Sequence, residues 1–249
     1  MEMEYCKWYS PALAREMEVK FYGHAGKPVL YIPCQNGRFY DFENFGMAGA
    51  LTRYLESGRM MVCAVDTIDA ETWSDRGRSP QERIGIYEQW ITYLTDEVIP
   101  ALRDRANERN GWTGYPGVLA FGCSLGATHA ANLYFRRPDL FDSLLALSGI
   151  YTAEYGFDGY MDERVYLNSP VHSLANMPSD HPYISLFNQK KAIICVGTGA
   201  WELPEETRRL ETILREKNIR AVVDYWGPDC SHDWYWWHAQ ADYFLPQIL

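Results

Sequence analysis

Short apolar runs alternate with longer amphipathic stretches along this chain, and the alternation predicts an α/β fold. Met60–Val65 is a continuous apolar run, which is typical of a parallel strand buried on both faces. Residues 79–82, Ser-Pro-Gln-Glu, form a capping box with proline at the first helical position. The amphipathic pattern that follows them predicts a helix through Leu102. Further strands are expected at 118–121, 144–148, 192–197 and 220–225, and further helices at 125–136, 204–217 and from about 234.

Strands separated by helices imply right-handed crossovers and a mostly parallel sheet covered on both faces. Residues 19–22 and 28–32 are expected to form an early pair of strands, joined by a turn at 23–26. Since no internal repeat or low-complexity linker interrupts the pattern, residues 1–249 are expected to form a single domain.

One segment, at about 150–190, departs from this rhythm. It is rich in Tyr, Asp, Asn, Pro and Ser and shows little periodicity. A long irregular stretch inside a compact domain is typical of a lid or a binding loop. The segment is therefore predicted to be a small lid-like insertion over the carboxyl edge of the sheet, where ligands bind in open α/β sheets. The alternative is a surface excursion that contains a short helix or two.

Composition favours a soluble enzyme domain. The formal charge of −10 argues against a nucleic-acid partner or an anionic membrane, because both require a basic face. No apolar stretch approaches the roughly 18 residues that cross a bilayer, and the acidic amino terminus does not resemble a signal peptide. The six cysteines are scattered and none forms C-x-x-C, so no metal site is predicted. Free thiols in a reducing cytoplasm are expected.

Candidate chemistry centres on residues 118–126, V-L-A-F-G-C-S-L-G. Here a G-x-S-x-G pattern lies between a predicted strand and a predicted helix, which is the context of a nucleophile elbow. In such a turn, the glycines on either side of the serine keep side chains from colliding where the strand meets the helix. Ser124 is therefore the predicted nucleophile. An ordinary strand-to-helix turn with an N-capping serine is the alternative.

A serine hydroxyl needs a base, and with this motif the acid and the histidine follow the serine along the chain. His232 follows the last predicted strand in a short loop before an aromatic helix, so it is predicted to lie beside the elbow as general base. A helix-capping role is the alternative. His129 lies on the helix that begins at the elbow, which is expected to carry it away from Ser124. The others are His238, inside the final helix, and His172 and His181, which could contact substrate from the insertion.

The acid is expected after the preceding strand, and Glu202 is the first carboxylate there. It would hold the imidazole in the tautomer that accepts the serine proton. Asp229 is the rival, but it lies only three residues before His232 and is expected to shape the loop. Asp233, the next residue after that histidine, has the same disadvantage.

An oxyanion hole needs two fixed donors. The backbone N–H of Leu125, directly after the nucleophile, is expected to supply one. The loop at 33–38 is expected to supply the other from Gln35 or Asn36, since the glycine at position 37 suits a backbone turned inward. A plain turn is the alternative.

Four segments together resemble the putative esterase (esterase D-like) family of the α/β-hydrolases. They are G-C-S-L-G at 122–126, Y-I-P-C-Q-N-G-R-F-Y-D-F at 31–42, G-T-G-A-W-E at 197–202 and S-H-D-W-Y-W-W at 231–237. The family branch includes feruloyl esterases and mycolyltransferases, and the resemblance covers nearly the whole chain. It implies an α/β-hydrolase fold and carboxylic-ester hydrolysis through an acyl-enzyme, with no metal or organic cofactor.

The resemblance also implies roles for individual residues. Ser124 matches the family's nucleophile and His232 its base. Glu202 falls near the family's acid, which is often aspartate and lies slightly closer to the strand. Many members have a glycine-rich oxyanion loop, whereas residues 35–37 here are Gln-Asn-Gly.

The expected function is hydrolysis of a small-molecule carboxylic ester. Trp201 and Trp234 lie near the predicted acid and base, where they either contact substrate or fill the core. Arg38, near the oxyanion loop, either meets an anionic substrate or is solvated. Acyl transfer by the same residues and a non-catalytic, hydrolase-like binding protein are the alternative functions. Exposed edge strands leave a homodimer open.

Overall fold

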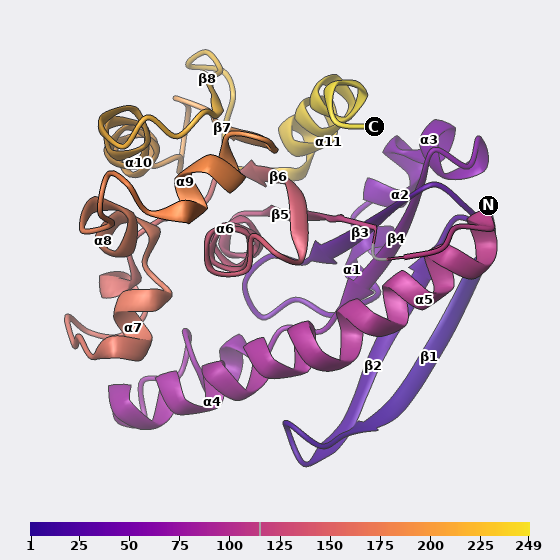
Figure 1. The fold of residues 1–249 in the computed structure, drawn as a ribbon, viewed down its shortest axis with the longest axis horizontal. Helices are drawn as coiled ribbons and strands as arrows, with labels where there is room; N and C mark the ends of the chain where they lie inside the picture. The colour runs from indigo at the N-terminus through magenta and orange to yellow at the C-terminus, as the bar shows by residue number, and fades with distance from the viewer. Residues whose placement is uncertain (115) are drawn as a thin grey trace.

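The computed structural model describes residues 1–114 and 116–249, and its centre is an eight-stranded sheet of order β1-β2-β4-β3-β5-β6-β7-β8 (Figure 1). β1 and β2 pair antiparallel, as do β2 and β4, and the other neighbours run parallel. This mostly parallel sheet, flanked by helices, confirms the predicted fold class. The strands are β1 (Met3–Ser10), β2 (Arg15–Tyr22), β3 (Lys27–Ile32), β4 (Met60–Val65), β5 (Val118–Cys123), β6 (Phe141–Leu147), β7 (Lys191–Val196) and β8 (Val222–Tyr225).

The amino-terminal strands differ from the prediction. β1 was not expected, and the two early strands do not pair with each other, because β4 lies between them. Val62 of β4 stands opposite Tyr22 on one side and Val29 on the other. The chain from β3 to β4 passes through three short helices, α1 (Asp41–Asn44), α2 (Met47–Ala50) and α3 (Thr52–Glu56). A short turn between two strands does not make them neighbours, because a later strand of the chain can insert between them.

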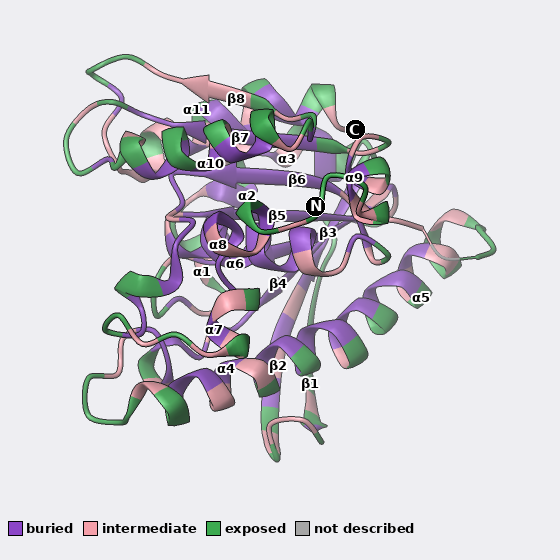
Figure 2. Ribbon diagram, turned by 60° about the vertical axis from the view of Figure 1, so that its left-hand side comes forward, coloured by how far each residue is buried: buried purple, intermediate pink, exposed green. Residues whose placement is uncertain are grey.

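Alternate side chains of the strands enter two separate cores. Leu30 and Ile32 of β3 pack with α4 (Pro80–Tyr93), α5 (Ile99–Asn110), α6 (Leu125–Arg136) and α10 (Pro204–Glu216). Val29 and Tyr31 pack on the opposite face with α1, α2, α3 and α11 (Trp234–Phe244). β4 and β5 are buried at every position, as expected for central parallel strands (Figure 2).

The long helix expected from residue 79 is present in three parts. The Ser79–Glu82 capping box opens α4, as predicted. A π-helical stretch, η2 (Leu94–Val98), then leads into α5, which has a proline in its first turn. Since proline has no N–H to donate, the wider π turn accommodates Pro100 without ending the helix.

The insertion at about 150–190 consists of short helices: η3 (Ala153–Tyr155), α7 (Glu163–Leu167), α8 (Pro170–Ala175) and α9 (Pro182–Phe187). Val165, Leu174 and Phe187 are almost fully buried in the core that α6 also enters. These side chains anchor α7, α8 and α9 in that core. The lid role of the segment at about 150–190 stays a prediction. The remaining short helices are η1 (Asp69–Glu71) and η4 (Leu245–Gln247).

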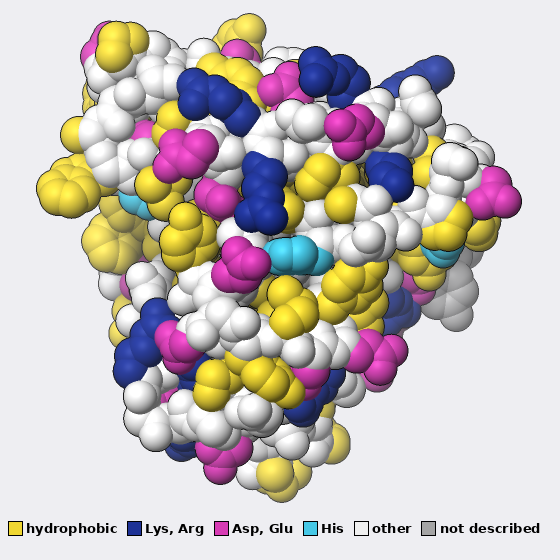
Figure 3. Space-filling view, turned by 90° about the vertical axis from the view of Figure 1, so that its left-hand side faces the viewer, with side chains coloured by type: hydrophobic (Ala, Val, Ile, Leu, Met, Phe, Trp, Pro, Cys, Tyr) yellow, Lys and Arg dark blue, Asp and Glu magenta, His cyan; other side chains and the backbone are white. Residues whose placement is uncertain are grey.

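On the side of the molecule shown in Figure 3, acidic, basic and hydrophobic side chains are interspersed, and the basic ones do not gather into one patch. Within the described ranges, no helix combines the length and apolar character that a membrane span requires.

Candidate active site

The elbow at Ser124 joins β5 to α6 in a strained backbone conformation. Ser124 has φ 56° and ψ −130°, a region that side-chain-bearing residues rarely adopt. Glycine is required on either side of the serine because backbone segments approach each other closely there. A Cβ on Gly122 would lie 2.3 Å from the carbonyl of Gly126, and one on Gly126 would lie 2.2 Å from the carbonyl oxygen of Ile32. The crossing of β5, α6 and the end of β3 therefore leaves room for no other residue at these positions.

His232 lies within hydrogen-bond distance of the elbow serine. Its Nε2 is 2.8 Å from Ser124 Oγ, and its Nδ1 is 3.2 Å from Glu202 Oε2. The main-chain N–H of His232 donates to the carbonyl of Ala200 at 3.0 Å, which connects the loop after β8 to the loop after β7. The helix-capping role belongs instead to Asp233, whose carboxylate accepts from the first N–H groups of α11.

Glu202 is held from behind by two donors. Its side chain is only 1% exposed, and Oε1 accepts from the Ser148 hydroxyl at 2.7 Å and from the Gly197 N–H at 3.2 Å. Oε2 is left to face His232. Asp229 is exposed, and among the described residues no hydrogen bond or ion pair joins it to His232. The geometry therefore brings together Ser124, His232 and Glu202.

The thiols near Ser124 are poor competitors as nucleophiles. Burial raises the pKa of Cys34 to about 12 and that of Cys230 to about 12. The fully buried thiol of Cys123, next to Ser124 in the chain, also has its pKa raised by burial. Because only the thiolate attacks readily, these groups stay inert at neutral pH.

The two candidate donors of the oxyanion loop, Gln35 and Asn36, differ in their position relative to the cavity. The backbone N–H of Asn36 already donates to Asp69 Oδ2 at 3.0 Å, and Asn36 is exposed outside the site cavity. Its main-chain N–H is therefore not available, which corrects that alternative. Gln35 lines the cavity, and its side-chain amide donates to Ser74 Oγ at 2.7 Å. Leu125 lines the same cavity at the start of α6.

Behind this loop lies a buried histidine that does not touch Ser124. The His129 ring is fully buried, with Nδ1 2.7 Å from the Tyr87 hydroxyl and Nε2 2.9 Å from Asp69 Oδ1. Asp69 thus joins α6, through His129, to the backbone of Asn36. Sequence reasoning missed Asp69 because nothing in the 60-residue separation from His129 signals their contact.

Ser124 and His232 open into a cavity of about 330 Å³. Of the predicted substrate contacts, Trp201 lies on its rim, 88% exposed. Trp234 lies elsewhere, stacked on Phe45 with ring centroids 4.9 Å apart. The other lining residues are Gln35, Trp73, Arg76, Leu125, Ser148, Ile150, Tyr155, Gly156 and Leu203.

Arg38, predicted as a possible substrate contact, has acidic partners in the structure. Arg38 donates to Asp66 and Glu18, at 2.9 Å each, and does not line the cavity. Arg76 does, and sequence reasoning missed it because it lies in an irregular loop far from the motifs. The described residues contain no group of three His, Cys, Asp or Glu side chains placed to hold a metal ion.

The eight-stranded, mostly parallel sheet with a G-x-S-x-G elbow after β5 has the architecture of an α/β-hydrolase. The chain belongs to the family described as "Putative esterase", whose model matches residues 10–247. It is therefore a carboxylic-ester hydrolase, and the predicted family and enzyme class are confirmed. No curated protein matches the chain significantly.

Solved structures with the same fold have low sequence identity. A ferulic acid esterase is 17% identical with a TM-score of 0.73, over 99% of this chain and 97% of the other. An S-formylglutathione hydrolase from Agrobacterium tumefaciens is 14% identical with a TM-score of 0.72, over 98% and 93%. FphF, a fluorophosphonate-binding serine hydrolase from Staphylococcus aureus, is 12% identical with a TM-score of 0.66, over 99% and 97%.

Proposed function

We propose that this enzyme hydrolyses small-molecule carboxylic esters through an acyl-enzyme on Ser124, with His232 as general base and Glu202 as the orienting acid. The observation that carries the proposal is the continuous line of contacts from Ser124 Oγ to His232 at 2.8 Å and from His232 to Glu202 at 3.2 Å. These three groups come from loops after β5, β8 and β7, which meet at the carboxyl edge of the sheet.

The reaction has two halves. In the first, Ser124 Oγ attacks the ester carbonyl while His232 Nε2 takes the hydroxyl proton, and the same nitrogen then protonates the leaving alcohol. In the second, His232 takes a proton from water, the hydroxide attacks the acyl-enzyme, and the proton returns to Ser124 as the acid leaves. Glu202 holds the imidazole with its Nδ1–H toward the carboxylate and stabilises the imidazolium that forms in each half.

The tetrahedral oxyanion is assigned to two main-chain donors, the N–H of Leu125 and the N–H of Gln35. Leu125 is the first residue of α6, so its N–H lies at the positive end of the helix dipole. Gln35 is the residue of the 33–38 loop that lines the cavity with Ser124. Fixed donors of this kind stabilise the charge only as it develops.

Hydrolysis is favoured over acyl transfer by the open rim of the cavity. Trp201 is 88% exposed and Tyr155 is 54% exposed, so both stand at a solvent-facing mouth. Water therefore reaches an acyl group on Ser124 without any movement of the chain.

The acyl-enzyme is tested by quenching the reaction with acid during turnover of p-nitrophenyl butanoate. Mass spectrometry should find one butanoyl group, located on Ser124, because deacylation needs the histidine in its basic form. The adjacent buried thiol supplies a matched control, since Cys123→Ala should keep the label on Ser124. A label on another residue, or turnover with no label on Ser124 under any quench time, would contradict the proposal.

Asp69 is expected to position the oxyanion loop. Its carboxylate accepts a hydrogen bond from the Asn36 N–H at 3.0 Å, and the residue is only 1% exposed. Asp69→Ala removes the acceptor of the Asn36 N–H and should lower kcat for p-nitrophenyl acetate about tenfold or more, with little change in KM. Tyr87→Phe is the matched control, since it alters the His129 contact and leaves the Asn36 contact in place. A rise in KM at constant kcat, or equal losses in both variants, would contradict this role.

A further inference from the structure

Arg76 is the one side chain with a fixed charge among the described residues that line the active-site cavity. It lies in the irregular loop between η1 and α4, and its side chain is 56% exposed. The cavity otherwise presents aromatic, aliphatic and neutral polar groups beside His232. A cation in the cavity is notable because the chain as a whole is acidic, with 33 acidic and 23 basic residues.

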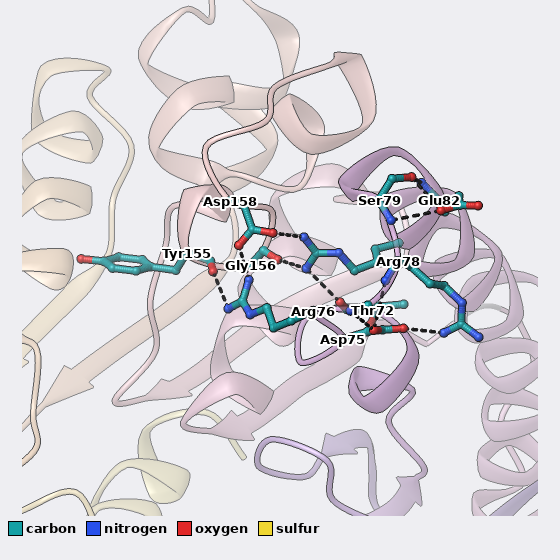
Figure 4. A network of polar contacts seen from close by, with 11 residues as sticks. Thr72, Asp75, Arg76, Arg78, Ser79, Glu82, Tyr155, Gly156 and Asp158 are labelled. Atoms are coloured by element: carbon teal, nitrogen blue, oxygen red, sulfur yellow. Dashed lines mark hydrogen bonds and ion pairs between the residues drawn. The ribbon is translucent and has the colours of Figure 1, made fainter.

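The guanidinium of Arg76 is held by groups from the insertion. It forms an ion pair with Asp158, and its second terminal nitrogen donates to the carbonyl of Tyr155 at 3.2 Å (Figure 4). The other oxygen of Asp158 pairs with Arg83, which is fully buried. Arg83 in turn donates to the carbonyl of Gly156 at 2.5 Å. The main chain at 155–156, which accepts a hydrogen bond from Arg76, is therefore held in turn by the buried Arg83.

Two arginines share one carboxylate here. Asp158 pairs with both Arg76 and Arg83, so Arg76 has no carboxylate to itself. Arg83 is fully buried, whereas the Arg76 side chain is 56% exposed and faces solvent. Arg78, two residues further on, is instead matched by its own partner, Asp75, at 2.6 Å.

Arg76 also has hydrogen-bonding capacity to spare. A guanidinium has five N–H donors in a planar fork, and the contacts to Asp158 and Tyr155 account for two of them. This geometry matches a carboxylate, which an arginine binds in its plane with two parallel hydrogen bonds.

The wall next to Arg76 has a fixed shape. A Cβ on Gly156 would lie 2.4 Å from the Trp73 ring, so the main chain of the insertion lies directly on this side chain. Trp73 also packs edge-on against Phe157 and His129, with ring centroids 5.3 and 5.6 Å away. Trp73, held in this way, and Arg76 both line the cavity that contains Ser124.

We infer that Arg76 binds a carboxylate of the substrate, so that the enzyme selects esters that carry a second, free carboxyl group, such as half-esters of dicarboxylic acids. This inference rests on the proposed function, because it places the scissile carbonyl at Ser124 while the free carboxylate meets Arg76. The aliphatic spacer then lies along Trp73.

The test compares two alkyl esters that differ only in charge: monoethyl adipate and the same ester with a primary amide in place of the carboxylate. The wild-type enzyme should prefer the carboxylate in kcat/KM by about ten- to a hundredfold, the range for hydrogen bonds to a charged group. Half-esters of succinate, glutarate and pimelate give the best spacer length. The preference should shrink as ionic strength rises, because salt screens an exposed guanidinium.

Arg76→Gln should abolish the preference, and Arg76→Lys should keep part of it. Each preference is a ratio within one variant, so a general loss of activity or stability cancels. Arg78→Gln is the matched control and should retain the wild-type ratio. Equal use of the carboxylate and the amide at every spacer length, with p-nitrophenyl acetate still hydrolysed, would overturn the role of Arg76 alone. Failure to hydrolyse p-nitrophenyl acetate as well would overturn the proposed function itself.

Discussion

Ser124→Ala is expected to lower kcat/KM for p-nitrophenyl acetate by about 10⁵-fold, because the reaction loses its nucleophile and retains only binding and oxyanion stabilisation. His232→Ala should have an effect of similar size, since the hydroxyl is then left without a base at 2.8 Å. The double variant should be scarcely worse than either single variant, because the two side chains act as one unit. Initial rates at high enzyme concentration would measure all three.

Two controls make this result specific. Labelling by a fluorophosphonate should occur in the wild type and be lost in Ser124→Ala, while thermal unfolding shows whether the variant remains folded. The catalytic assignment would be wrong if the two single losses multiplied in the double variant, or if Ser124→Ala kept substantial turnover in folded protein.

The sequence predicted the centre of the fold because burial on both faces leaves a strong local mark. Met60–Val65 and Val118–Cys123 are continuous apolar runs, and each ends at turn residues; the second leads directly into the elbow. The amino-terminal edge left no such mark. Met3–Ser10 is mostly exposed and alternates weakly, and its partner strand inserts beside β4 rather than β3. That order depends on long-range pairing, which a local pattern does not contain.

Residues placed by chain order were easier to predict than residues placed by loop packing. Glu202 and His232 each follow a strand of the parallel sheet, so topology alone brings them to Ser124. Arg38 and Arg76 show the opposite case. Both lie in loops, and only the tertiary contacts, to Asp66 for the first and to Asp158 for the second, determine which of them reaches the cavity.

Glu202→Gln is expected to lower kcat nearly as much as Ser124→Ala or His232→Ala does, and the contacts of Glu202 explain why. Oε1 accepts from the Ser148 hydroxyl and the Gly197 N–H, so a glutamine must keep its carbonyl oxygen at that place. Its NH₂ group then faces His232 Nδ1. The histidine answers with the opposite tautomer and presents Nε2–H to Ser124, where it can no longer accept the proton.

A loss of kcat of about 10³- to 10⁴-fold should follow, with little change in KM, because substrate binding does not use this carboxylate. Asp229→Asn is the matched control: it removes the exposed rival carboxylate from the same site and should leave kcat within about twofold, as is usual for a surface substitution. At high pH the glutamine variant should recover little, since its defect is the tautomer and not the ionisation of His232. If Asp229→Asn caused the larger loss of kcat, the acid would have to be reassigned, and the line of contacts through Ser148 and Gly197 would be structural support for the loop after β7.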